Sequence, residues 1–219
     1  PPDLYIVPQH RYHLRLADEV LDAYLSWQGA QSRPTFAFVN VMDAHLLHSA
    51  PLPERRRYPP FERGEGDYNA SIRYLDQQLD RLFKTLAERR VLDRTIIIVT
   101  SDHGELLGEH GLKGHARSMY KDVLHVPLMV RYPPAVPKGT RISRAVSLRD
   151  LAATITDLAG VGRKQFPGVS LANAWRNSSV ELSAALGEVR RQDNPLGDYP
   201  TATGALKALA TDDWCYIHN

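Results

Sequence analysis

The sequence of 219 residues has a single cysteine, little net charge and no long apolar run. Because Cys215 has no second cysteine to pair with, a disulfide within the chain is excluded. The 27 lysines and arginines nearly balance the 25 aspartates and glutamates, so charge gives no general attraction to nucleic acid or to an anionic membrane surface. No apolar run approaches the roughly 20 residues that cross a bilayer. With 43% apolar residues, the composition predicts a globular chain with a buried core.

We expect the sequence to be a fragment at both ends. The chain begins at Pro1 with neither an initiator methionine nor a signal-peptide pattern, and residues 214–219 resemble the middle of a strand. We therefore expect a fragment of a longer domain. Because such a fragment exposes a sheet edge and an apolar face, we also expect self-association.

Helical and strand patterns alternate along the chain. Helices are expected where apolar residues recur at helical spacing, at 16–27, 67–90 and 148–158. Strands are expected where apolar and β-branched residues cluster, at 35–41, 95–100, 126–131, 184–189 and 205–210. The apolar strands 35–41 and 95–100 are typical of a sheet buried on both faces. Without repeats or low-complexity linkers, the pattern predicts one α/β domain over residues 1–219.

Residues 48–66 are rich in proline, glycine and arginine and have no hydrophobic period. They predict a long surface loop, a kind that is uncommon unless it has a function, at the rim or lid of a site. The three consecutive arginines at 55–57 can steer an anionic substrate, but solvated side chains are the commoner explanation and the one we expect here.

Polar residues follow the most hydrophobic strand, 95–100, as Ser101, Asp102, His103, Gly104 and Glu105. In open α/β sheets, ligands bind at the carboxyl ends of strands. A carboxylate and an imidazole side by side can both turn toward one divalent cation, and their donors suit Mg, Mn, Ca or Zn. Taken alone, an Asp-His-Gly sequence is more often a capped turn, so the surrounding residues decide.

The stretch from Thr100 to His115, followed by Tyr120 and Val126-Pro127-Leu128, resembles the second metal-binding signature of the sulfatase family, within the alkaline-phosphatase-like superfamily. The resemblance extends over roughly residues 34–219. It implies an α/β fold with a mostly parallel sheet flanked by helices, of which this chain carries an incomplete part.

The resemblance implies roles for individual residues. Asp102 and His103 stand where family members bind one divalent metal ion. His115 stands where the family has a lysine or histidine that contacts the sulfate or phosphate and assists the leaving oxygen. Lys113 is a neighbouring candidate for that electrostatic role, although an exposed loop lysine is the commoner case. His45 is similar to a strand-end histidine that hydrogen-bonds the anion or the leaving group, the alternative being a structural histidine at a sheet edge.

Two loop residues, Glu109 and His110, are expected to stabilise the loop rather than to act in the site. The residue after the metal-binding aspartate is asparagine in many sulfatases, which favours Ca, whereas His103 is similar to phosphoesterase-leaning members and some sulfatases and admits Mn or Zn. After His45, Leu46-Leu47 replace the proline and aromatic residue that often follow. In family order the nucleophile and the leading metal-binding aspartates precede Pro1, so we expect the chain alone to be inactive.

The function implied is metal-dependent hydrolysis of a small-molecule or glycan sulfate ester. One alternative is a phosphodiester or phosphonate hydrolase, or a phosphoglycerol or phosphoethanolamine transferase, of the same superfamily. Another is an inactive fragment or pseudoenzyme that binds an anion or a partner chain. The resemblance also suggests an extracytoplasmic location, periplasmic or secreted, or a membrane anchor.

Overall fold

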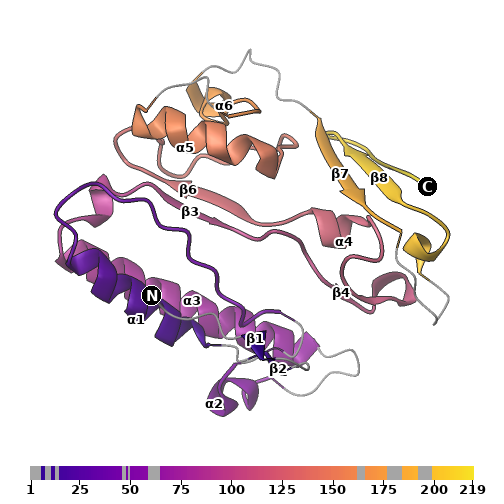
Figure 1. Cartoon of the computed structure of the whole chain (residues 1–219), viewed down its shortest axis with the longest axis horizontal. Helices are drawn as coiled ribbons and strands as arrows, with labels where there is room; N and C mark the ends of the chain where they lie inside the picture. Colours follow the sequence, from indigo (N-terminus) through magenta and orange to yellow (C-terminus); the bar gives the residue numbers. More distant parts are fainter. Residues whose placement is uncertain are drawn as a thin grey trace. The chain divides into compact units, whose positions relative to one another are not determined.

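A computed structural model of the chain describes residues 6–7, 11–12, 15–45, 48, 50–58, 65–161, 166–176, 184–191 and 199–219. Its contacts divide the chain into two compact units, Pro1–Arg90 and Val91–Asn219, and Figure 1 labels most of their helices and strands. The single domain expected from the sequence stays a prediction.

The first unit is built on two helices that pack together, α1 (Ala17–Gly29) and α3 (Glu65–Glu88). Both were predicted by their apolar spacing. Leu21 and Leu25 of α1 and Leu82 and Leu86 of α3 are buried. The unit also contains the short helix α2 (Leu52–Arg55) and an antiparallel pair of two-residue strands, β1 (Ile6–Val7) and β2 (Arg11–Tyr12).

Polar contacts add to the packing of α1 on α3. Arg89 donates a hydrogen bond to the carbonyl oxygen of Leu25 at 2.7 Å, and Arg81 forms an ion pair with Asp22. The predicted apolar face of α3 needs one correction, because Ile72 is 42% exposed. In this turn of α3 the buried residues are Ser71 and Tyr74. They are three residues apart and share one face of the helix, so Ile72 lies to one side of the buried face.

Asp43 holds the N-terminus of α1. The residue before the helix, Leu16, has no side chain that can cap it, and Asp43 Oδ1 accepts a hydrogen bond from the amide of Ala17 at 3.1 Å. The first amides of a helix lack partners within the helix, and a carboxylate favours the positive end of the helix dipole. The Asp43 side chain is nearly fully buried, so this contact ties the segment that precedes His45 to α1.

The prediction of a buried strand at 35–41 is wrong for this structure. Phe36 is 71% exposed and Phe38 is 84% exposed, and the segment forms no strand pairing among the described residues. Its composition favours a strand, but burial on both faces needs neighbouring strands and covering helices that only tertiary packing supplies. The exposed phenylalanines agree with the expected self-association, which stays a prediction.

The expected loop at 48–66 contains α2 and runs into the start of α3; residues 46, 47, 49 and 59–64 lie outside the described part of the chain. Its first arginine is not simply solvated. Arg55 forms two hydrogen bonds with the carboxylate of Asp67, at 2.8 and 2.9 Å, which lowers the pKa of Asp67. Such a bidentate pair fixes both side chains in one geometry. Arg56 and Arg57 are exposed, as expected.

The first strand of the second unit is β3 (Ile97–Thr100), which pairs with β6 (Leu128–Arg131). A three-stranded sheet follows, made of β7 (Ala185–Val189), β8 (Leu206–Ala210) and β9 (Cys215–His218). These strands confirm the segments predicted at 95–100, 126–131, 184–189 and 205–210, and the strand pattern of the last residues. Every pairing among the described strands is antiparallel, so the parallel part of the expected sheet is not among them.

The helix predicted at 148–158 is also confirmed, as a 3₁₀ turn that continues into α5 (Leu151–Ala159). Gly160 ends it in the left-handed conformation, with φ 71°, which glycine adopts without a steric penalty. Two further short helices are α4 (Lys121–Leu124) and α6 (Asn173–Arg176). The 3₁₀ turns of the unit are η1 (Leu92–Arg94), η2 (Glu109–Gly111), η3 (Leu148–Asp150) and η4 (Pro200–Ala202).

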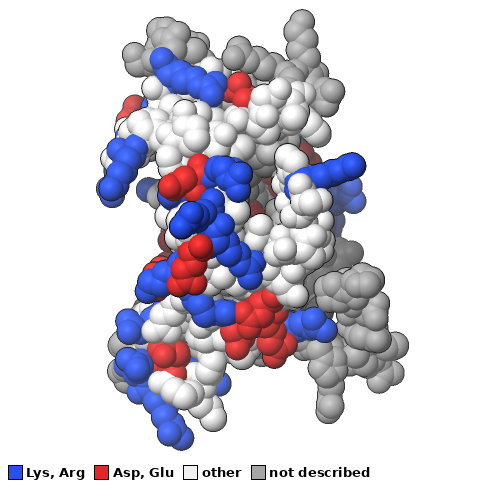
Figure 2. Space-filling model, turned by 90° about the vertical axis from the view of Figure 1, so that its left-hand side faces the viewer, with Lys and Arg blue, Asp and Glu red and all other residues white. Residues whose placement is uncertain are grey.

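The surface agrees with the charge balance of the sequence. On the face drawn in Figure 2, acidic side chains lie among the basic ones, as the net charge of +2 leads one to expect. Of the helices that the structure describes, none has the length and apolar character that a membrane crossing requires.

Asp43 makes stability depend on pH. Burial raises the pKa of its carboxyl group, and the nearby Asp18 adds to this, against the opposing hydrogen bond from Ala17. A raised pKa means that Asp43 stabilises the fold fully below its unfolded pKa, and that this contribution is lost as pH rises through the folded value. We expect Asp43→Asn, which keeps the acceptor oxygen, to unfold at higher urea than wild type at about pH 7.5, with the difference closing toward about pH 4.

The control for this prediction is Asp43→Ala, which removes the acceptor as well as the charge. Losing a helix cap costs about 1 kcal/mol, so this variant should unfold at lower urea than Asp43→Asn at both pH values. If both variants are destabilised equally at neutral pH, the buried charge is not what limits stability.

Candidate metal and anion site

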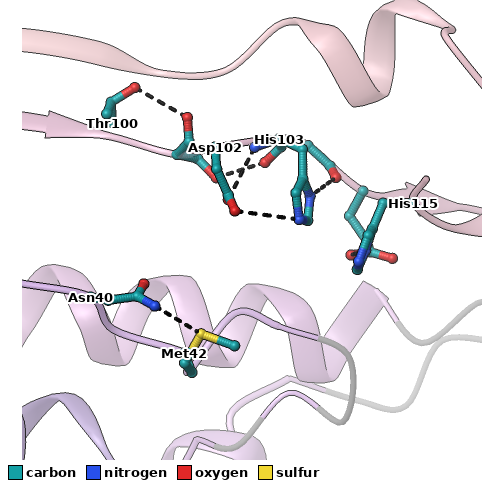
Figure 3. A network of polar contacts seen from close by, with 9 residues as sticks. Asn40, Met42, Thr100, Asp102, His103 and His115 are labelled. Carbon is teal, nitrogen blue, oxygen red and sulfur yellow. Dashed lines mark hydrogen bonds and ion pairs between the residues drawn. The ribbon is translucent and has the colours of Figure 1, made fainter. Parts of the chain in front are cut away.

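The predicted site residues of the second unit lie on the segment that follows β3. The pairing of β3 with β6 extends to Thr100, whose hydroxyl donates a hydrogen bond to the carbonyl oxygen of Pro127 at 2.8 Å. The chain leaves the sheet at the next residue, so Asp102 and His103 project from a point where strand pairing no longer sets the side-chain direction. Figure 3 shows these two residues together with His115.

Asp102 and His103 offer donors of different kinds side by side. Asp102 Oδ2 lies 3.7 Å from His103 Nε2, and the Asp102 side chain is 87% exposed. His103 Nδ1 lies 2.9 Å from the carbonyl oxygen of Gly104. Because a carbonyl only accepts hydrogen bonds, Nδ1 carries the proton and the lone pair lies on Nε2. An exposed carboxylate oxygen next to an imidazole lone pair fits a divalent cation.

His115 is brought beside His103 by a small hairpin. Strands β4 (Leu106–Leu107) and β5 (Lys113–Gly114) pair in antiparallel register. This pairing carries His115 back to the end of β3, where its ring stacks on that of His103 with centroids 4.0 Å apart and planes inclined by 27°. His115 Nδ1 also lies 3.0 Å from Glu105 Oε2. The structure therefore joins two predicted residues, His103 and His115, with a third that the sequence analysis did not assign.

Glu105 is the functional candidate that sequence reasoning missed. Donor atoms of His103, Glu105 and His115 all lie within 4.8 Å of one another, the cluster of metal-binding side chains found in the described residues. Glu105 was noted only as the last residue of a polar stretch. Its contact with His115 depends on the hairpin register, and two short extended segments separated by glycines are the only signal of this in the sequence.

Position 104 must be a glycine because of a backbone contact that the sequence alone does not reveal. Its amide donates a hydrogen bond to the carbonyl oxygen of Val123 at 2.7 Å. A Cβ atom at this position would lie 2.0 Å from the carbonyl oxygen of Asp122, far closer than atoms approach without a shift. The backbone between His103 and Glu105 is therefore pressed against α4, and only glycine fits there.

The loop between β4 and β5 has the internal contacts expected of it. Glu109 accepts a hydrogen bond from the amide of Leu107 at 2.6 Å, and the ring of His110 stacks on Tyr120 with centroids 3.8 Å apart. These contacts agree with the prediction that Glu109 and His110 stabilise the loop. They hold the turn through which the chain returns to His115.

The remaining predicted residues, Lys113 and His45, are not members of this cluster. Lys113 is exposed in β5, opposite Leu107, and its role stays a prediction. His45 belongs to the first unit, where its amide donates to the carbonyl oxygen of Met42 at 3.0 Å. Its assignment to the anion site also stays a prediction.

Asp102, His103 and His115 line a cavity of the second unit with a volume of about 1720 Å³. Basic side chains outnumber acidic ones in the lining of this cavity. The basic residues are Lys121, Arg131, Lys138, Arg141, Arg144 and Arg149. Two of these are held by carboxylates, Arg131 by Asp93 at 2.5 Å and Arg144 by Asp212 at 3.8 Å. The lining also contains four acidic residues, Asp102, Glu188, Asp212 and Asp213, so basic side chains exceed acidic ones there by two.

Comparison with known proteins identifies the family. The family model described as Sulfatase matches residues 4–161. The chain belongs to the sulfatase family. The choline-sulfatase of Rhizobium meliloti is 31% identical over 158 residues, which are 71% of this chain and 29% of that protein. The N-acetylglucosamine-6-O-sulfatase of Bacteroides thetaiotaomicron is 43% identical over 96 residues, 43% of this chain and 17% of that protein.

The solved structures support the fold that the sequence implied for a sulfatase. The phosphonate monoester hydrolase of Agrobacterium radiobacter superposes with a TM-score of 0.77 at 22% identity, covering 93% of this chain and 53% of that one. The α/β, alkaline-phosphatase-like fold is thereby confirmed. The chain spans less than a third of the length of the curated relatives named above.

The close approach at Gly104 predicts a specific sensitivity. We expect Gly104→Ala to lower the free energy of unfolding by about 1–3 kcal/mol, the usual cost of an added group without space, measured by thermal or urea unfolding. Gly29→Ala is the matched control, because a Cβ there meets only the guanidinium end of the flexible Arg89 side chain, at 3.3 Å. Equal stability of the Gly104→Ala and Gly29→Ala variants would contradict the packing described.

Proposed function

We propose that the protein hydrolyses sulfate esters, and that this chain supplies part of its metal and anion site. The observation that carries the proposal is the placement of His115 beside the Asp102–His103 pair, in a chain that belongs to the sulfatase family. In this proposal Asp102 and His103 bind the metal, and His115, whose ring stacks on that of His103, is the group that exchanges protons.

Asp102 and His103 are the residues that hold a divalent ion, Ca, Mn, Mg or Zn, in this proposal. Their exposed carboxylate and the lone pair on Nε2 are the donors that support it. When bound, the ion polarises the anionic group of the ester. Two side chains are fewer than such an ion normally takes, so other residues of the protein complete the shell.

His115 is proposed to act on the leaving oxygen, with His45 and Lys113 contacting the anion. An imidazole is suited to proton transfer because its ordinary pKa lies near neutrality. A cationic or proton-donating group placed where negative charge develops stabilises the transition state. The contact of His115 with a buried carboxylate and its position on the cavity wall support this role.

The substrate class proposed is a small-molecule or glycan sulfate ester. The relatives are named for choline sulfate and for a 6-O-sulfated N-acetylglucosamine. The excess of basic side chains around the cavity agrees with an anionic substrate.

A second candidate is hydrolysis of a phosphonate or phosphate diester. Two observations favour it: the fold matches a phosphonate monoester hydrolase, and the residue after Asp102 is a histidine. Both ester classes present a tetrahedral anion, so the cavity by itself does not separate them.

A paired assay on the full-length protein tests the proposal. Hydrolysis of an aryl sulfate and of an aryl phosphodiester is measured with Ca and with Mn, for wild type and for Asp102→Ala. We expect sulfate turnover in wild type and a loss of at least about 100-fold in the variant, since residues that merely support metal ligands already cost 10–100-fold. Asp76→Ala, which changes an exposed carboxylate of α3, is the control and should keep full turnover.

Each other outcome has a definite meaning. Faster diester than sulfate turnover establishes the second candidate. No turnover with any metal favours a non-catalytic protein and overturns the proposal. Equal activity of wild type and Asp102→Ala removes Asp102 from the site.

A further inference from the structure

We propose that Glu105 is a positioning residue for His115, holding the imidazole by Nδ1 so that Nε2 is the nitrogen that meets the leaving oxygen of the ester. The inference rests on the proposed function, in which His115 acts at that oxygen. Glu105 itself touches neither the ester nor the metal in this assignment.

The direction of the hydrogen bond follows from the chemistry of its two ends. His115 Nδ1 and Glu105 Oε2 are 3.0 Å apart, with side-chain exposures of 23% and 7%. An ionised carboxylate can only accept, so Nδ1 must donate. The imidazole is therefore fixed in one tautomer and one orientation, and proton exchange with a substrate takes place at Nε2.

The register of the β4–β5 hairpin brings Glu105 and His115 together. In the β4–β5 register, Leu106 pairs with Gly114 and Leu107 with Lys113. Extending the same register by one residue places Glu105 opposite His115, as directly cross-strand neighbours on one face. Gly114 lies beside the carboxylate, where a Cβ would be in ordinary contact with Glu105 Oε1 at 3.7 Å, and its φ of 87° is one that glycine adopts without strain.

Because the Glu105 side chain is buried, loss of its contact with His115 would cost free energy. The Glu105 carboxylate is almost removed from solvent, and its Oε1 has no hydrogen-bond partner among the described residues. Removing one member of a buried pair leaves the other charge poorly compensated. His115 is therefore the group that compensates the Glu105 carboxylate, and the two side chains act as a unit.

A metal site formed by Glu105 with both histidines is the alternative, because the three donor groups are close together. The ring geometry argues against this. A metal ion lies in the plane of an imidazole that binds it, whereas His103 and His115 are stacked face to face, 4.0 Å apart and only 27° from parallel. No point near both rings lies in both planes, so one ion cannot be bound by both imidazoles.

The proton transfer that results is simple. As the bond between sulfur and the leaving oxygen breaks and sulfur bonds to the attacking oxygen nucleophile, the electron pair stays on the leaving oxygen. That oxygen takes the proton from His115 Nε2 and departs as an alcohol. His115 therefore enters the step as an imidazolium with protons on both nitrogens, and giving up the Nε2 proton leaves it as a neutral imidazole whose Nδ1 proton is still held by Glu105.

The test uses the full-length protein and two sulfate esters, one with a nitrophenol leaving group and one with an alkyl alcohol. In Glu105→Gln we expect kcat for the alkyl ester to fall about 10–100-fold, the usual effect of an orienting partner, with KM changed less than about 3-fold. The nitrophenyl ester should lose much less, because its leaving oxygen departs without a proton. A purely structural defect would lower both rates equally.

Three companion measurements keep the result interpretable. The double variant Glu105→Gln with His115→Gln should be no slower than His115→Gln alone, because residues acting as a unit are not additive. Manganese affinity, measured by calorimetric titration, should stay within about 3-fold in Glu105→Gln, whereas loss of a metal ligand would weaken it further. Glu109→Gln, a change in the same loop, should affect both esters alike.

Failure of this inference is distinguishable from failure of the proposed function. Wild type without sulfatase turnover overturns both. Active wild type with an unchanged Glu105→Gln, or with equal losses on both esters, overturns the positioning role alone. If Glu105→Gln does not fold, Glu105→Asp is used, and a shortened carboxylate that keeps the nitrophenyl rate but not the alkyl rate supports the role.

Discussion

The contact between the Gly104 backbone and α4 is the constraint on which the site depends. Its amide bonds to Val123, and the approach to the carbonyl of Asp122 leaves no space for a side chain. This fixes the path of the chain as it leaves β3, with His103 before the contact and Glu105 after it. The hairpin starts directly beyond, so the stacking of His115 on His103 follows from where Gly104 is held.

From this arrangement two pairs of side chains emerge with different chemistry. Asp102 and His103 present oxygen and nitrogen donors toward solvent, as a cation requires. Glu105 and His115 form a largely buried pair, in which the carboxylate orients an imidazole. The two pairs meet where the ring of His103 stacks on the ring of His115, and this stacking keeps both imidazoles from binding one ion. Residues of one short segment can therefore serve separate tasks.

The sequence predicted the elements whose signal is local. The helices α1 and α3 have apolar residues at helical spacing and β3 lies in a continuous apolar run, and each element was found within a few residues of its expected position. Segment 35–41 has an equally apolar composition but is exposed, because a buried strand is defined by neighbours that its own sequence does not contain. Arg55 differs from its expected solvated state for a similar reason, since its partner Asp67 is twelve residues away on another helix.

The candidate site shows the same division. By itself the sequence determined the family resemblance and the identities of Asp102, His103 and His115, because these depend on residue type and spacing along the chain. Only the tertiary structure decided that Glu105 meets His115, that Asp43 caps α1 and that Gly104 cannot carry a side chain. Each of these depends on a strand register or a backbone approach between residues distant in the sequence, which composition and spacing do not specify.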